Sequence, residues 1–346
     1  MIGATGNVGT SLLDALAREP AVTSVLGVAR RRPELSVDKV VWEQADIGTD
    51  DLLPLLADAD AAVHLAWLLQ PSRNEAQQWR TNVVGTGRLL AAVEKAGIST
   101  FVYASSIGAY SPAPPGVVVD ESHPTDGVAT SQYSRQKAYT ERQLDAFESR
   151  NPGARVVRMR KGLIIKPGAA SGIRRLFAGP LLPTPLLRAV GVPVWPATRG
   201  LQLQFVHSHD VADAYRLAIV GDAQGAFNIA ADPVIDAPTA AKALDAVQLP
   251  LAPRVLRATV AASWRLRLQP AEPGWIDLAL GAPLMSTKRA HSVLGWWPVH
   301  RADDTLAELV QAVGRSQGLP TPPLAPSTSW RGRMAELKSG VGRRST

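Results

Sequence analysis

Short apolar runs alternate with amphipathic segments of helical period through the first two thirds of the chain. The apolar runs are residues 22–29, 61–66, 100–105 and 154–165. The helical segments are residues 11–18, 76–96 and 132–148. Strands that alternate with helices are typical of βαβ units. The pattern therefore predicts an α/β fold with a doubly wound parallel sheet.

The alternation loosens after Pro167, where Pro- and Gly-rich segments follow. We expect residues 1–165 to form the sheet domain, with a strand and a helix returning to it from about residues 200–230. Residues 166–318 would then form mainly a smaller cap. Such a cap packs over the carboxyl ends of the strands, where open α/β sheets bind ligands.

The last part of the chain, residues 319–346, has the composition of a disordered basic tail. It begins Pro320-Thr-Pro-Pro-Leu-Ala-Pro326 and continues rich in Ser, Gly and Arg, so it has little apolar surface to bury. From residue 320 onward it holds five basic residues and one acidic residue, and so supplies +4 of the formal net charge of +7. The remaining charge gives no reason to expect a nucleic-acid partner.

The composition favours a soluble, cytoplasmic protein. There is no Cys, which excludes disulfides and a thiolate nucleophile. No apolar run reaches the roughly 20 residues needed to cross a bilayer. Residues 255–268, for example, contain Arg257, Arg265 and Arg267 and are expected to form an amphipathic helix. We therefore expect no membrane partner.

Three glycines near the start form a G-x-x-G-x-x-G turn, followed by a helix expected from about Thr10. Glycines allow a tight bend and let backbone N–H groups approach a diphosphate at the N-terminus of the helix. Three glycines alone are also compatible with an ordinary turn. The expected dinucleotide contacts in this segment are Gly3, Thr5, Gly6, Asn7, Val8 and Gly9.

The strand that should lead into this turn is almost absent, since only Met1 and Ile2 precede Gly3. That strand is central in a doubly wound sheet, and its loss would leave unpaired backbone groups that cost roughly 1–3 kcal/mol each. We therefore expect a truncated first strand, and we hypothesise a native start upstream of Met1. An N-terminal peptide beginning at Met1 in the native source would contradict this hypothesis.

The next strand is followed by Arg30, Arg31 and Arg32, with no carboxylate at its end. A ribose 2′-hydroxyl is usually held by a carboxylate at that place, whereas a 2′-phosphate requires arginine. NADP(H) is therefore favoured over NAD(H), with Arg30 and Arg31 as the phosphate contacts. The alternative is a solvated turn.

Tyr133-Ser-Arg-Gln-Lys137 places a phenol and an ammonium four residues apart, on one face of a helix. A phenol with its ordinary pKa near 10 is a poor base at neutral pH, and a neighbouring ammonium favours its ionised form. Tyr133 could then exchange a proton with a substrate oxygen, which Ser106, at the end of a strand, could also bind. Such a pair also occurs by chance on surface helices.

The order and spacing of these motifs resemble the extended short-chain dehydrogenase/reductases, also called NAD-dependent epimerase/dehydratases, over about residues 1–315. The motifs that carry the resemblance are the glycine turn, Val63-His64-Leu65-Ala66, Asn82-Val-Val-Gly-Thr86, Tyr103-Ala-Ser-Ser106, Tyr133 with Lys137, Phe205-Val-His-Ser-His-Asp210 and Leu294-Gly-Trp296.

The resemblance implies a Rossmann-like fold that binds NAD(P), with catalysis by Tyr133, Lys137 and Ser106. It implies that Asp46 and Ile47 contact adenine and that Asn82 supports the active-site end of the sheet. The remaining implied cofactor contacts are Leu65, Ala66, Tyr133 and Lys137.

Two positions depart from the family pattern. Lys166 replaces a glycine near the nicotinamide end, where it could make the backbone less able to approach a ligand or could offer a cation to an anionic substrate. Leu203 stands where nucleotide-sugar members have an arginine that clamps the diphosphate, although Arg174, Arg175 or Arg188 could substitute. A sugar nucleotide is therefore no better supported than a smaller, more apolar carbonyl or alcohol of the steroid-like kind.

We expect structural rather than catalytic roles for several other residues. His64 is expected to be hydrogen-bonded beside the cofactor, Asp210 to order the junction with the cap, and Trp296 and Trp297 to pack an end of the fold. His207 and His209 could pair as metal ligands, but their spacing along a strand and the lack of acidic neighbours other than Asp210 argue against it. We expect no metal.

The sequence thus predicts an NAD(P)-dependent oxidoreductase or epimerase that acts on a carbonyl or secondary alcohol of a small molecule. The alternative is a non-catalytic redox sensor or scaffold of the same fold, and the retained Tyr133 and Lys137 count against it. The sequence leaves open the oligomeric state, a homodimer included.

Overall fold

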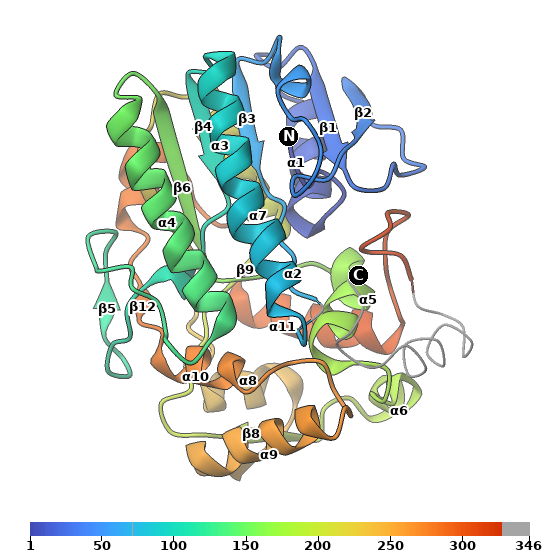
Figure 1. Cartoon of the computed structure of the whole chain (residues 1–346). Helices are drawn as coiled ribbons and strands as arrows, with labels where there is room; N and C mark the ends of the chain where they lie inside the picture. The colour runs from blue at the N-terminus through green and yellow to red at the C-terminus, as the bar shows by residue number, and fades with distance from the viewer. Residues whose placement is uncertain (71, 327–346) are drawn as a thin grey trace.

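A computed structural model describes residues 1–70 and 72–326, and its centre is a parallel sheet (Figure 1). Four strands pair in the order β10-β6-β4-β3, and β1 pairs with β2 beside them, all in parallel. The bounds are β1 Val25–Ala29, β2 Val40–Gln44, β3 Ala61–His64, β4 Thr100–Tyr103, β6 Arg155–Lys161 and β10 Gly225–Ile229.

Residues 1–3 lie between β1 and β3, the place of a central strand. Ile2 bridges both Val28 and His64, and its N–H donates to Val63 O at 2.8 Å. On the other side Gly3 N–H donates to Val28 O at 2.9 Å. These few residues therefore join the two groups of strands into one sheet.

Helices cover both faces of the sheet, as the alternating pattern predicted. Leu12 and Leu13 of α1 pack with Tyr215 of α7 against one face, and Leu89 of α3 packs with Phe147 of α4 against the other. The helix bounds are α1 Asn7–Ala17, α2 Glu75–Trp79, α3 Gly85–Ala96, α4 Gln132–Arg150 and α7 Ser208–Val220. The π-helical turn Arg80–Val84 joins α2 to α3 within the expected helix 76–96.

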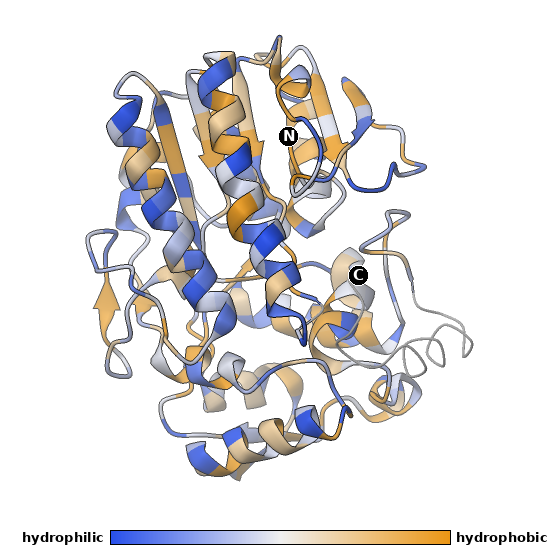
Figure 2. Cartoon of the chain, viewed as in Figure 1, coloured by the Kyte–Doolittle hydropathy of each residue, from blue (hydrophilic) through white to orange (hydrophobic). Residues whose placement is uncertain are grey.

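The strands are predominantly apolar, except that β6 carries hydrophilic positions along its length (Figure 2). The single strand expected at residues 154–165 is wrong, because it is two strands. β6 ends at Lys161, and β7 (Leu163–Ile165) pairs with β9 (Phe205–His207) in a separate small sheet. Gly162 lies at the break, where the absence of a side chain lets the Gln204 backbone approach, since a Cβ there would lie 2.4 Å from Gln204 O.

The C-terminal part forms a smaller layer at the carboxyl ends of the strands (Figure 1). Its core includes Ile165, Phe205, Ile235 and Leu306. Its helices are α5 Ala170–Ile173, α6 Thr184–Val190, α8 Ala237–Leu244, α9 Pro253–Arg265, α10 Gly274–Gly281 and α11 Ala302–Gly314. Within this part β8 Val194–Ala197 pairs with β11 Val247–Pro250, while β12 Leu284–Met285 pairs with β5 Val118–Val119 from the N-terminal part.

The expected disorder from residue 319 onward is wrong for residues 319–326. Leu324 is 4% exposed and Thr321 is 1% exposed. Arg175 donates to Pro323 O at 2.8 Å and to Ala325 O at 2.7 Å, so it holds this segment against the turn after α5. The segment thus buries apolar surface that composition alone did not indicate. Residues 327–346 of the expected tail lie outside the described residues.

Among the described residues, no helix combines the length and the apolar character needed to cross a membrane. The expected amphipathic helix at 255–268 is α9, none of whose residues is buried.

Candidate active site

Tyr133 and Ser106 meet at the carboxyl end of β4. Ser106 follows β4 and begins the 3-10 turn Ile107–Ala109, where its Oγ accepts from Gly108 N at 3.0 Å. Tyr133 lies in the first turn of α4, and its hydroxyl lies close enough to Ser106 for that side chain to lower the phenol pKa. A side chain at position 108 would collide with the phenol, because a Cβ there would lie 2.8 Å from Tyr133 Cε1. Gly108 therefore lets the two candidate residues approach.

The Tyr133 phenol is protonated at neutral pH. Burial raises its pKa to about 12, although the Ser106 side chain opposes the rise. A protonated phenol can donate to a substrate oxygen that gains negative charge. The site therefore has the acid that reduction of a carbonyl requires.

Lys137 lies one turn further along α4 and is 3% exposed. Its Nζ donates to Ala104 O at 2.6 Å and to Tyr103 Oη at 3.2 Å. The same Nζ lies 3.4 Å from the centre of the Trp67 ring but 6.0 Å from the centre of the Tyr133 ring. Burial, followed by the charge of Lys161, holds the pKa of Lys137 well below its ordinary value.

A buried network of charges fixes α4 against the sheet. Glu141, one turn beyond Lys137, accepts from Arg158 Nη1 and Arg160 Nη2 at 3.0 Å each and also from Ser105 Oγ. Burial raises the pKa of Glu141, but the two arginines outweigh that effect, so the carboxylate is ionised. The i, i+4 repeat of Tyr133, Lys137 and Glu141 was the signal for this residue, and sequence reasoning missed it.

Lys161 is a second buried lysine close to the site that sequence reasoning missed as a site residue. Its Nζ donates to Ser105 O at 2.8 Å and to Tyr215 Oη at 3.1 Å. Burial lowers its pKa from the ordinary 10.5 to about 7. Two lysines with lowered pKa values therefore lie beneath the end of β4.

The glycine turn fits the diphosphate of a dinucleotide. Gly3 has φ +86°, and a Cβ there would lie 2.6 Å from Ala66 N, next to Leu65. A Cβ at Gly9 would collide with Ala4 O, 2.5 Å away. At Gly6 the nearest atom to a Cβ would be Gly3 O at 3.4 Å, so the space beside Gly6 is open. In the described chain no side chain caps α1, so its first N–H groups can face an anion.

Residues of the glycine turn form hydrogen bonds with segments that are distant in the sequence. Asn7 Nδ2 donates to Ile164 O at 3.0 Å, while the buried Asn7 Oδ1 has no partner in the described structure. Thr321 Oγ1 donates to Thr5 O at 2.9 Å. Val8 is half-buried beside them. The helix begins at Asn7, three residues before the expected Thr10, so the turn enters it directly.

The expected adenosine contacts lie along one edge of the sheet. Arg30 and Arg31 are exposed directly after β1. Asp46 follows β2, where its Oδ1 accepts from Gly48 N at 2.8 Å, and Ile47 beside it is buried. Because β1 and β2 are parallel, their carboxyl ends lie at the same edge of the sheet. The residues that follow the two strands therefore lie at that edge, beside the glycine turn.

Asn82 lies in the π-helical turn between α2 and α3 and is completely buried. Its Oδ1 accepts from Leu68 N at 2.7 Å, and its Nδ2 donates to Leu68 O at 2.9 Å and to Gln136 Oε1 at 2.8 Å. Asn82 therefore joins the segment after β3 to α4, near Lys137.

Three other polar residues have structural partners. His64 Nε2 is hydrogen-bonded with Thr86 Oγ1 at 2.9 Å, and burial lowers the His64 pKa to about 3. Lys166 does not face the substrate side as expected, because its buried Nζ donates to Thr10 Oγ1 at 2.6 Å and Ser11 Oγ at 2.8 Å on α1. Trp296 is buried, whereas Trp297 is 65% exposed, so only the first packs the interior.

Aromatic rings enclose the Tyr133 phenol. The ring centre of Trp275, from α10, lies 4.8 Å from that of Tyr133, and the centre of Trp67 lies 6.0 Å away on edge. Phe177 packs on Trp275 at 5.0 Å. A cavity of about 10 Å³ opens between them, lined by Trp67, Leu68, Leu69, Tyr133, Trp275 and more polar residues. Nothing local marked Trp275, which lies 142 positions after Tyr133 in the chain.

A doubly wound sheet with a glycine turn at the start of its first helix defines a dinucleotide-binding α/β protein. The chain belongs to the NAD dependent epimerase/dehydratase family, whose sequence profile matches residues 1–230.

Relatives in several bacteria share part of the chain. An uncharacterized protein of Mycobacterium tuberculosis is 26% identical over 243 residues, which are 67% of this chain and 62% of that protein. The chain thus spans less than two thirds of the length of this relative. A 4-hydroxy-2-methyl-3-oxo-4-farnesyl-3,4-dihydroquinoline-1-oxide ketoreductase of Stigmatella aurantiaca is 29% identical over 47% of this chain and 48% of its own. A putative dihydroflavonol 4-reductase of Synechocystis is 33% identical over 35% and 36%.

Solved structures share the fold. A UDP-glucuronic acid 4-epimerase of Bacillus cereus, in complex with NAD, superposes with a TM-score of 0.66 at 17% identity, covering 91% of this chain and 97% of that one. A UDP-glucose 4-epimerase of Thermotoga maritima gives 0.65 at 18% identity, covering 91% and 97%. The Rossmann-like fold expected from the motifs is therefore confirmed.

Proposed function

We propose that the chain is an NAD(P)-dependent oxidoreductase that reduces a carbonyl. The observation that carries this proposal is the meeting of the Tyr133 phenol with the Ser106 segment at the carboxyl end of β4, with the buried Lys137 one helical turn away. Membership in the family and the uncrowded backbone at Gly6 support a dinucleotide as the cofactor. The retained Tyr133 and Lys137 argue against a purely sensing role.

The proposed roles follow from the atoms each residue offers. When bound, a nicotinamide dinucleotide supplies the hydride to the carbonyl carbon. The turn from Gly3 to Gly9 would hold its diphosphate, and Lys137 would bind its ribose. Tyr133 would donate its proton to the oxygen that gains charge, and Ser106 would hold that oxygen in place.

We propose an apolar, planar substrate rather than a nucleotide sugar. The rings of Trp67 and Trp275 beside Tyr133, with Phe177 packed on Trp275, offer flat apolar surface. Leu203 packs against the core of the C-terminal layer, and Arg174 and Arg175 donate to backbone carbonyls. The names of two relatives, a ketoreductase and a putative dihydroflavonol reductase, agree with this substrate class.

We propose NADP(H) as the preferred cofactor. Arg30 and Arg31 are exposed at the end of β1, where the residue before them is Ala29 rather than a carboxylate. The solved relative cited above holds NAD, so the preference rests on these arginines alone. The lack of cysteine supports a cytoplasmic location. A homodimer stays a prediction that sedimentation can test.

The proposal is tested by following NADPH absorbance in the presence of planar aromatic ketones, quinones and UDP-glucose. We expect oxidation of NADPH with members of the first two groups and none with UDP-glucose. Turnover of UDP-sugars without net consumption of NADPH would instead support epimerisation. Failure to bind either dinucleotide in calorimetry would overturn the proposal as a whole.

A further inference from the structure

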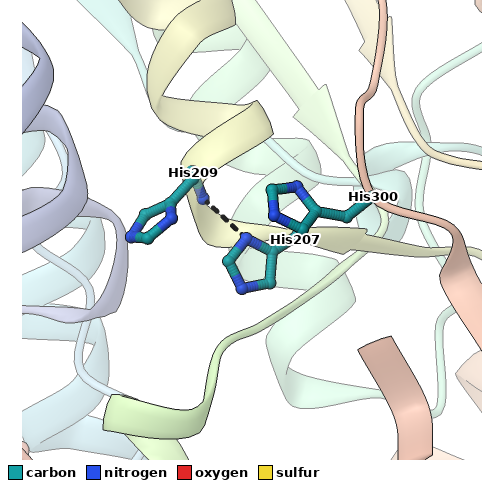
Figure 3. A group of neighbouring side chains, drawn as sticks. All are labelled: His207, His209 and His300. Carbon is teal, nitrogen blue, oxygen red and sulfur yellow. Dashed lines mark hydrogen bonds between the residues drawn. The ribbon is translucent and has the colours of Figure 1, made fainter. Parts of the chain in front are cut away.

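Three histidines from two distant parts of the chain meet where β9 ends and α7 begins (Figure 3). His207 ends β9, His209 lies in the first turn of α7, and His300 precedes α11. One ring nitrogen from each lies within 4.8 Å of the others. The His207 and His300 rings stack with centres 4.0 Å apart, and the His209 ring lies edge-on, 4.8 Å from His207. Sequence reasoning weighed only the first two, and His300 supplies the missing third.

Asp210 fixes the orientation of the His300 ring. A carboxylate that does not itself touch the metal often fixes a metal-binding histidine in this way. Asp210 Oδ1 accepts from His300 Nδ1 at 2.9 Å, and Asp210 Oδ2 accepts from His300 N at 3.0 Å. Asp210 is 4% exposed, so both oxygens are committed to these bonds. A proton held on Nδ1 leaves the lone pair of His300 on Nε2, where a metal can bind it.

His207 is the second imidazole of the cluster. Its Nδ1 accepts a long hydrogen bond of 3.3 Å from His209 N, so a stronger partner can replace it. The third imidazole, His209, is exposed, so its ring can turn toward the other two.

The charges around the cluster tolerate a cation. Lys166 is the nearby ammonium, and its buried Nζ donates to Thr10 and Ser11 hydroxyls on α1. Asp210 supplies a carboxylate bonded to His300. His209 lines a cavity of about 410 Å³ together with Ser11 and Asp14, so a second carboxylate and open space lie beside this member of the cluster.

We propose that His207, His209 and His300 bind a divalent transition metal of the Zn²⁺, Co²⁺, Ni²⁺ or Cu²⁺ class. Imidazole suits these ions, and three histidines with an outer carboxylate leave one position for water. Zn–N bonds of about 2.1 Å in a tetrahedron place the nitrogens roughly 3.4 Å apart, so the cluster has to close slightly. The exposed His209 is the side chain free to make that movement. The ion would tie the start of α7 to the segment before α11.

The test uses the full chain, freed of any affinity tag and of metal. Calorimetry with Zn²⁺ should give a single ion per chain, and Co²⁺ should develop visible absorption bands of a nitrogen-ligated ion. His209→Ala and His300→Ala should each weaken Zn²⁺ binding at least about tenfold. The control His291→Ala removes a histidine that stacks on the exposed Trp297 instead, and its affinity should match wild type. Zn²⁺ should raise the Tm of wild type and of this control, but not of His209→Ala.

The proposal is overturned if His209→Ala binds Zn²⁺ as tightly as wild type, or if wild type binds none. Circular dichroism checks the fold of each variant. Should a variant fail to fold, electron paramagnetic resonance of Cu²⁺ on wild type decides: couplings to several imidazole nitrogens support the cluster, and their absence rejects it.

Discussion

The ammonium of Lys137 lies over the indole of Trp67, 3.4 Å from the centre of its ring. Trp67 comes three residues after the end of β3, next to Ala66 beneath the glycine turn. A cation over an aromatic face is attracted by about 0.5–2 kcal/mol, depending on its desolvation. A ribose hydroxyl that binds Lys137 therefore competes with Trp67, and the balance between the two affects cofactor affinity.

Lys137→Met should weaken binding of the dinucleotide about tenfold or more, because a hydrogen bond to a charged group contributes about 1.5–3 kcal/mol. The matched control is Arg135→Met, which removes an exposed cation from the same helix. Calorimetric titration of NADPH into each variant measures the effect. Equal losses in both variants would show that only the general charge of α4 matters.

Tyr133→Phe should reduce turnover by at least about 10²-fold while changing cofactor affinity little, since it removes the proton donor and keeps the ring. Tyr139→Phe is the control, because Tyr139 is 46% exposed on the same helix. Steady-state rates and calorimetric affinities are compared for the two variants. A Tyr133→Phe enzyme with ordinary turnover would refute the proposed proton transfer.

The pair of substitutions Ala29→Asp and Arg30→Ser should reverse the cofactor preference. The wild type should bind NADPH tens of times more tightly than NADH, because a charge-assisted bond to the 2′-phosphate is worth about 1.5–3 kcal/mol. The new carboxylate accepts from the ribose hydroxyl and repels the phosphate. Equal wild-type affinities for the two cofactors would mean that the arginines form only a solvated turn.

Stability should rise as the pH rises from about 7, and Lys161 should account for part of that slope. The folded chain releases the Lys161 proton near pH 7, whereas the unfolded chain keeps it until about 10.5. The unfolded state therefore binds more protons in this window, which raises the free energy of unfolding by at most about 1.4 kcal/mol per pH unit. Urea unfolding at several pH values, in wild type and in Lys161→Met, measures the slope. If the free energy of unfolding changes with pH equally in the two proteins, Lys161 makes no contribution to the slope.

Shortening the chain should separate two parts of its C-terminus. A chain that ends at Pro326 keeps every contact described above and should unfold like wild type. A chain that ends at Gly318 loses the buried Leu324 and Thr321 and should be less stable by about 2–5 kcal/mol, as for removal of a buried leucine. Leu324→Ala tests the same contact without truncation. Equal melting temperatures for the two truncated chains would contradict the packing of this segment.

Local pattern was enough to predict α4 and the strands β1, β3 and β4, because a buried strand or an amphipathic helix repeats its signal several times. It failed at Gly162, since residues on both sides of the break are extended and the approach of the distant Gln204 backbone leaves no local signal. It failed again at residues 319–326, where burial depends on Arg175 and α5 rather than on composition.

The residues of the candidate site also fall into two groups, those that local sequence predicts and those that it does not. Tyr133, Lys137 and Ser106 belong to motifs with a fixed local spacing, so the amino-acid sequence alone singles them out. Trp275 and His300 have no such spacing, because each approaches its neighbours only through the packing of the C-terminal layer. Lys166 was misjudged because its position in the motif does not determine which way a long side chain turns.

The hydrogen bond from Thr321 to Thr5 joins residues 316 positions apart, so it connects the glycine turn with a segment that the ribosome makes more than three hundred residues later. At about 5–20 residues per second, the nascent glycine turn waits roughly 15–60 s for that partner. Pairing over such a separation is also slow to form after release, because the loop-closure entropy is lost before the contact forms. The turn that would hold the diphosphate is therefore synthesised long before its partner and completed late in folding.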